Sequence, residues 1–130
     1  MRLGWDDPTA SLTNAIPGGR DVSSYAVIQF RAVVNFDDAR NTGPQDLSVV
    51  LTDGNGNSSS QVVSTSSRAL FFPPGSVEST RAVPKIVQNT VRIPLSAFRG
   101  VDLTNIVSVT LNYDQTPAGA LMLSDLAFSD

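Results

Sequence analysis

Six polar side chains occupy alternating positions in three segments that have the pattern of β-strands. They are planar amides, guanidinium groups and one hydroxyl: Gln29, Arg31, Gln88, Arg92, Thr110 and Asn112. Side chains at positions i and i+2 of a strand lie on the same face of a sheet. Groups of these types hydrogen-bond the hydroxyls of a sugar. If the three strands share one concave face, these residues form a ligand-binding site for a hydroxyl-rich molecule.

The two arginines, Arg31 and Arg92, are the strongest candidates in this set, because a guanidinium among strand residues usually has a charged partner or a ligand. The alternative is an ordinary solvated sheet face, on which these arginines pair with Asp46 or Asp114. The sequence leaves both interpretations open.

A sugar site also needs an exposed aromatic ring that stacks on the ligand. Several aromatic residues fall on apolar strand phases or at a strand end, where a place in the core is expected: Phe30, Phe36, Phe98, Tyr113 and Phe128. Trp5, Tyr25 and the pair Phe71 and Phe72 remain as candidate platforms. Trp5 is favoured because it is the only tryptophan and precedes two aspartates. A position for Trp5 in the core or at a sheet edge is the alternative.

The chain has no cysteine and no histidine, which excludes disulfides, thiolate and imidazole metal ligands, cysteine nucleophiles and histidine-based catalytic relays. No serine lies in a G-x-S-x-G turn, and the acids are too scattered to indicate a glycosidase pair of carboxylates. The segment DGNGN at 53–57 resembles half of a calcium loop but lacks the later glutamate, so a hairpin turn is expected there. We therefore expect a non-catalytic protein.

Short alternating apolar segments, separated by Gly, Pro, Asn and Asp clusters, predict the elements that position these residues. The expected strands cover residues 25–36, 46–53, 86–95, 106–114 and 120–128, with a hairpin partner for the second one after the turn at 53–57. Ser96 is expected to cap one helical turn, and residues 71–84 have the weak pattern of a loop or an irregular edge. The pattern predicts an all-β protein.

Length and charge are typical of one globular domain, covering residues 1–130. The formal net charge is −3 and Lys85 is the only lysine, so no basic stripe is available and nucleic acid is not expected as a partner. No apolar run has the length of a membrane span, so no membrane partner is expected. The first residues, with Asp6 and Asp7, do not have the pattern of a signal peptide. The chain is expected to be a fragment of a larger secreted, extracellular protein.

The C-terminal third resembles a known family. The stretch VRIPLSAFRGVDLTNIVSVTLNYDQTPAGALMLSDLAFS, residues 91–129, resembles the end of galactose-binding-like domains, and DVSSYAVIQFRAVV, residues 21–34, is similar to an earlier strand of that family. Such domains occur as carbohydrate-binding modules of secreted bacterial hydrolases. The resemblance implies a jelly-roll β-sandwich of two antiparallel sheets. In it, Leu95 and Phe98 would plug one end, and Gly119 would allow a tight entry into the last strand.

The same resemblance bears on metal binding. In this family the last strand commonly carries two acids, the first of which often ligates a structural calcium ion between the chain ends; the corresponding pair here is Ser124 and Asp125. Asp125, together with Asp6 or Asp7 near the other terminus, would then supply oxygen ligands for calcium. The alternative is that these acids cap turns and solvate strand ends.

The resemblance implies an accessory domain that binds polysaccharide or oligosaccharide and targets an attached catalytic domain. The alternative is a structural or protein-interaction sandwich that stabilises a neighbouring catalytic domain without binding free glycan, and the shortage of exposed aromatic residues favours it. The observation that bears most on this choice is whether Trp5, Arg31 and Arg92 converge on an open groove or lie within the packing.

Overall fold

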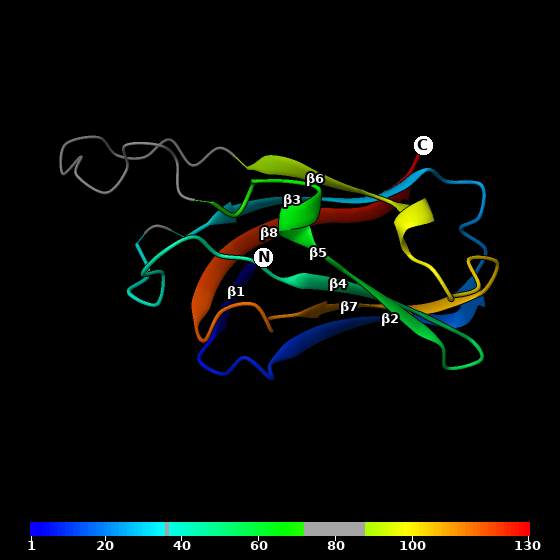
Figure 1. The fold of residues 1–130 in the computed structure, drawn as a ribbon, viewed down its shortest axis with the longest axis horizontal. Coiled ribbons are helices and arrows are strands. Elements are labelled where there is room, and N and C mark those ends of the chain that lie inside the picture. The colour runs from blue at the N-terminus through cyan, green and yellow to red at the C-terminus, as the bar shows by residue number, and fades with distance from the viewer. Residues whose placement is uncertain (36, 72–87) are drawn as a thin grey trace.

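The computed structural model describes residues 1–35, 37–71 and 88–130, which form two layers of β-sheet (Figure 1). The described strands are β1 (Arg2–Trp5), β2 (Ser11–Arg20), β3 (Val27–Val34), β4 (Ser48–Asp53), β5 (Ser58–Val62), β6 (Asn89–Pro94), β7 (Ile106–Asn112) and β8 (Gly119–Ser129). Single 3-10 turns, η1 (Val63–Thr65) and η2 (Leu95–Ala97), follow β5 and β6. No helix within these ranges is long and apolar enough to cross a membrane.

The strands form two four-stranded antiparallel sheets. Sheet A has the order β1-β8-β3-β6, and sheet B has the order β2-β7-β4-β5. The prediction of an all-β sandwich of two antiparallel sheets is confirmed. Five of the eight strands were expected from their alternating pattern, and β5 was expected as the hairpin partner of β4. Residues 72–84 of the expected loop lie outside the described residues, as does Phe36.

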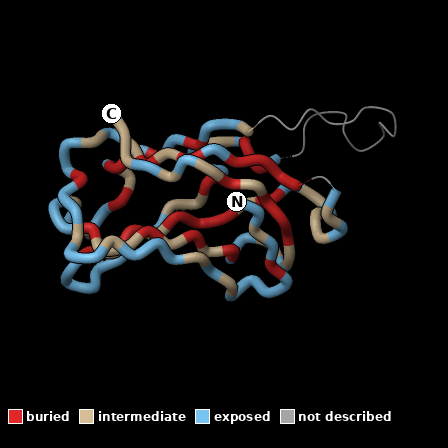
Figure 2. The backbone as a smooth tube through the Cα atoms, turned by 180° about the vertical axis from the view of Figure 1, so that it is seen from behind, coloured by how far each residue is buried: buried red, intermediate tan, exposed pale blue. Residues whose placement is uncertain are grey.

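The core lies between the two sheets, because alternate side chains of each strand point inward. In β3, Ile28, Phe30 and Ala32 are at most 1% exposed, and they form one cluster with Leu51 of β4 and Leu111 of β7. Figure 2 shows buried segments in the middle of the molecule and many exposed ones at its turns. Each strand of sheet A therefore has a second, outward face that is free of core packing.

The end of the sandwich after β6 is closed by the residues of η2 and the loop after it. Leu95 and Phe98 are buried, as expected for residues that plug this end. The expectation that Ser96 caps a helical turn is wrong, because η2 begins at Leu95 and Pro94 precedes it without a side-chain cap. Ser96 therefore lies inside the turn.

The turn between β4 and β5 is built around Asp53, and the predicted hairpin turn is confirmed. The carboxylate of Asp53 is almost fully buried. It accepts hydrogen bonds from the backbone N–H groups of Asn55 and Asn57 in the turn and of Asp102 in the loop before β7, each at 2.9 Å. These bonds lower the pKa of Asp53 below its usual value, and the bond from Asp102 has the largest effect. Asp53 therefore ties the β4–β5 hairpin to the neighbouring loop.

Candidate functional site

The outer face of sheet A collects several of the polar residues that the sequence predicted as a site. β3 lies between β6 and β8. Gln29 of β3 is opposite Arg92 of β6, and Arg31 is opposite Thr90. Arg31 and Arg92 are diagonal neighbours, and the Cα atoms of such residues lie about 7–8 Å apart in an antiparallel pair. We call this surface the arginine face; its residues are Gln29, Arg31, Gln88, Thr90, Arg92, Ser124 and Asp125.

Few contacts hold the two guanidinium groups of the arginine face. Nε of Arg31 lies 3.7 Å from Oδ2 of Asp125, and the two side chains are 60% and 65% exposed. An exposed pair of this kind contributes little to stability. Arg92 donates a hydrogen bond of 2.6 Å to the backbone carbonyl of Asp130. Among the described residues, no ion pair joins the Arg92 side chain to an aspartate side chain.

Asp46 and Asp114, which the sequence offered as partners for these arginines, bond to other groups. Asp46 accepts hydrogen bonds from the backbone N–H groups of Leu47 and Ser64. Asp114 accepts one from the hydroxyl of Ser48 at 2.8 Å. The pairing with the arginines that the alternative included is therefore wrong, because both acids belong to the environment of sheet B.

Two hydrogen-bond acceptors of the arginine face lie around Ser124, which is opposite Arg31. The hydroxyl of Ser124 is 2.9 Å from Oε1 of Gln88 and 3.1 Å from Oδ2 of Asp125. A hydroxyl proton serves one acceptor at a time. Either the amide oxygen or the carboxylate oxygen is therefore left for another donor, such as a hydroxyl of a ligand.

Asp125 occupies a β-bulge in β8. The register between β3 and β8 shifts between Gln29 and Arg31, so that one extra residue of β8 is accommodated opposite this part of β3. Asp125 has a φ of 57° and is the only described non-glycine residue with a positive φ. Aspartate tolerates this left-handed conformation better than most residues. The bulge thus places an acid beside Arg31.

Thr110 and Asn112 lie on the other side of the molecule. Both belong to β7, a central strand of sheet B. Oγ1 of Thr110 is 2.9 Å from Oγ1 of Thr13 in β2, and Asn112 is opposite Ser11. The expectation that all six polar residues share one concave face is wrong, because β7 pairs in a different sheet from β3 and β6. These two residues do not join the arginine face.

Trp5 lies in the core, which was the alternative weighed for it. Its side chain is buried, and its ring stacks on that of Tyr113 with centroids 4.5 Å apart and planes 12° from parallel. Nε1 of Trp5 donates to the backbone carbonyl of Thr116 at 3.3 Å. Burial raises the pKa of the Tyr113 phenol. Trp5 therefore offers no exposed ring for a sugar, and its expected role as a ligand platform does not fit this packing.

The two aspartates expected to share a calcium ion lie far apart. The residue before Asp6 is opposite Gly119, at the start of β8. Asp125 lies six positions further along the chain, about 20 Å away at the usual rise of a strand. Asp6 lies 3.6 Å from Arg40 instead. The described residues contain no group of three or more acids placed to hold a metal ion. The expected pairing of Asp6 with Asp125 is therefore wrong.

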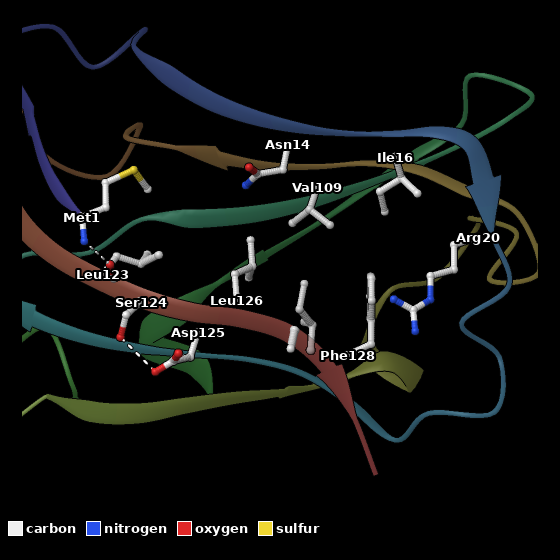
Figure 3. Close-up of a pocket in the computed structure, with 12 residues that line it drawn as sticks. Met1, Asn14, Ile16, Arg20, Val109, Leu123, Ser124, Asp125, Leu126 and Phe128 are labelled. Carbon is white, nitrogen blue, oxygen red and sulfur yellow. Dashed lines mark hydrogen bonds between the residues drawn. The ribbon is translucent and has the colours of Figure 1, made fainter.

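An edge groove of about 710 Å³ opens between the two sheets, along β8 and β2. Figure 3 shows side chains of β8 on one side of it, with Asn14, Ile16 and Val109 on the other. Its floor is apolar, and Arg20 and Asp125 lie at its rim. Of the residues predicted as a site, only Asp125 lines this groove. Alternation along single strands could not reveal the groove, because it depends on where β1 and β2 pair.

Sequence alternation contained a signal for one further residue of the arginine face. Thr90 lies two positions from both Gln88 and Arg92 and is exposed on the same face. Ser124 could not be recognised in this way, because its place beside Arg31 depends on the pairing of β8 with β3.

Comparisons with protein-family models, with curated proteins and with solved structures find no match for this chain.

Proposed function

We propose that this chain is a non-catalytic accessory domain that binds polysaccharide through the arginine face. The observation that carries the proposal is the gathering of Gln29, Arg31, Gln88 and Arg92 on one solvent-exposed sheet face. Their N–H groups are donors, and the oxygens of Gln88 and Asp125 are acceptors, as the paired donors and acceptors of sugar hydroxyls require.

The proposal includes the jelly-roll topology and the extracellular location that the family resemblance implies. Successive strands alternate between the two sheets, except that β4 and β5 form a hairpin within sheet B. This connectivity of the eight described strands in two sheets favours a jelly roll. The resemblance of residues 91–129 to carbohydrate-binding modules supports the same function.

Affinity electrophoresis tests polysaccharide binding directly. The panel contains soluble glucan, xylan and mannan together with polygalacturonate and alginate. We expect at least one polymer to retard the protein, with weaker retardation of Gln29→Ala and unchanged retardation of the matched variant Thr110→Ala on sheet B. Migration unaffected by every polymer would contradict the proposal.

A second candidate function is a structural sandwich that packs on a neighbouring catalytic domain. The outer face of sheet B favours it: Thr13, Thr110, Val50 and Ser60 form one row across the four strands, without a charged group. An uncharged row of this kind is suited to packing against another domain. Where the chain is joined to a catalytic domain, removal of this sandwich should lower the melting temperature of that domain. A pure binding module should leave it nearly unchanged.

A further inference from the structure

Positive charge is distributed unevenly over the two outer faces. Arg2 of β1, Arg31 of β3 and Arg92 of β6 lie on outward positions of sheet A. The outward positions of sheet B are Ser11, Thr13, Ala15, Ser48, Val50, Thr52, Ser58, Ser60, Val62, Ser108, Thr110 and Asn112. None of those side chains is charged. The outward arginines of the two sheets therefore lie on sheet A, where Arg31 also has Asp125 beside it, in a chain whose formal net charge is −3.

The arginines on the side of sheet A differ in how strongly they are already bound. Arg40 donates to both carboxylate oxygens of Asp38, at 2.8 and 2.7 Å. These bonds hold the pKa of Asp38 at about 2. Arg31, in contrast, has a single ion pair within residues 1–35, 37–71 and 88–130, an exposed contact of 3.7 Å with Asp125. Arg92 donates to the main-chain oxygen of Asp130, and among the described residues it forms no ion pair with an aspartate side chain.

A guanidinium has five N–H donors, so both arginines of the arginine face retain donors for a ligand. A carboxylate accepts two parallel bonds from one guanidinium, and such charge-assisted bonds are stronger than neutral ones. Arg31 and Arg92 are diagonal neighbours, so their head groups can bind the same polymer chain. A neutral polymer would use only part of this donor set.

We propose that the ligand of the arginine face is an acidic polysaccharide, whose uronate carboxylates are bound by Arg31 and Arg92. The amides of Gln29 and Gln88 bind hydroxyls of the same chain. This inference rests on the proposed function, since it names the class of polysaccharide that the proposed site recognises.

Asp125 opposes such a ligand, because its carboxylate lies beside Arg31 and repels a second acid. The substitution Asp125→Asn removes that charge. Asparagine tolerates the left-handed φ of this position, so the bulge should be kept. We therefore expect Asp125→Asn to bind acidic polymers more tightly than the unmodified chain does.

The test compares polygalacturonate and alginate with their carboxyl-reduced forms, in which each uronate has become a neutral sugar. Affinity electrophoresis should show retardation by the acidic polymers that is lost on carboxyl reduction. The double variant Arg31→Gln/Arg92→Gln should bind at least about tenfold more weakly, as expected from the loss of charge-assisted hydrogen bonds. The control Arg20→Gln/Arg99→Gln removes the same charge outside the arginine face and should bind as the unmodified chain does.

Two results would overturn the inference while leaving polysaccharide binding in place. One is equal retardation by acidic and carboxyl-reduced polymers. The other is an acidic polymer that retards the Arg31→Gln/Arg92→Gln variant as strongly as the unmodified chain. If no polymer in the neutral or acidic panel retards the protein, the proposed function itself fails.

Discussion

Replacing Gly119 with alanine would place a methyl group inside the packing around Trp5. Gly119 is the first residue of β8 and lies opposite Trp5 in the β1–β8 register. A Cβ built there would lie 2.5 Å from Oε1 of Gln45 and 2.7 Å from Cη2 of Trp5, and it would also meet Cζ2 of that ring. Glycine is required at this position by the close approach of the ring.

Neither the Trp5 ring nor the Gln45 side chain can move away without losing contacts. The ring of Trp5 is stacked on Tyr113. Gln45 is 3% exposed, accepts a hydrogen bond from Thr116 at 2.7 Å and donates one to the carbonyl of Ala118. Overpacking of a core costs about 1–3 kcal/mol. Alanine also restricts the unfolded chain, which stabilises the folded state by up to about 1 kcal/mol and offsets part of the packing cost. For a site with two fixed neighbours, we expect a net loss of roughly 2 kcal/mol.

Equilibrium unfolding in urea, followed by the fluorescence of Trp5, measures this loss. With a slope of about 2 kcal/mol per molar urea, the midpoint of Gly119→Ala should fall by about 1 M. The control is Gly43→Ala, because a Cβ at Gly43 meets no heavy atom within 4 Å. Its midpoint should stay constant or rise slightly. Equal midpoints for the two variants would refute the account of packing around Trp5.

Three further predictions concern charge and the core. The bonds from Arg40 keep the pKa of Asp38 in the folded protein at about 2, below its ordinary value of 3.8. The stability that these bonds contribute is therefore present above about pH 4 and is lost as the pH falls toward 2. The melting temperature should therefore fall more steeply over this window in the unmodified chain than in Asp38→Asn; parallel curves would contradict this. Asp53→Asn should lower the melting temperature at pH 7, because an amide cannot accept all the hydrogen bonds that Asp102 and the turn donate. An unchanged peak in scanning calorimetry would argue against the role of Asp53 in tying the hairpin to the loop. Leu111→Ala empties a fully buried position and should lower the free energy of unfolding by about 2–5 kcal/mol, measured by urea titration; a loss below about 1 kcal/mol would mean that the core collapses around the site.

The sequence was informative where a strand packs one face on the core. The alternation of Ile28, Phe30 and Ala32 predicted β3, and similar patterns predicted β4, β6, β7 and β8. β1 and β2 were not recognised. β1 has only four residues, and the sequence of β2 contains Pro17, Gly18 and Gly19, which usually indicate a turn. Such residues are tolerated in β2 because it is an edge strand whose register with β7 is interrupted there.

The candidate site was harder to predict, because alternation fixes the face of a residue within its own strand but not the sheet to which the strand belongs. Arg31 and Arg92 share a face because β3 pairs with β6, and Thr110 is excluded because β7 pairs with β2 and β4. Both facts depend on long-range pairing. The position of Trp5 depends in the same way on Tyr113, which lies more than a hundred residues away in the sequence.

The arginine face and the core share strands but not side chains, which makes the binding tests interpretable. In β3, Phe30 is fully buried, while its neighbours Gln29 and Arg31 point to the other side. The ion pair of Arg31 is long and exposed, so its substitution should change the free energy of unfolding by no more than about 0.5 kcal/mol. A variant that loses polymer binding and keeps the urea midpoint would therefore have lost recognition alone. A variant that loses both would show that the outer face of β3 takes part in packing, and its assignment as a binding surface would be wrong.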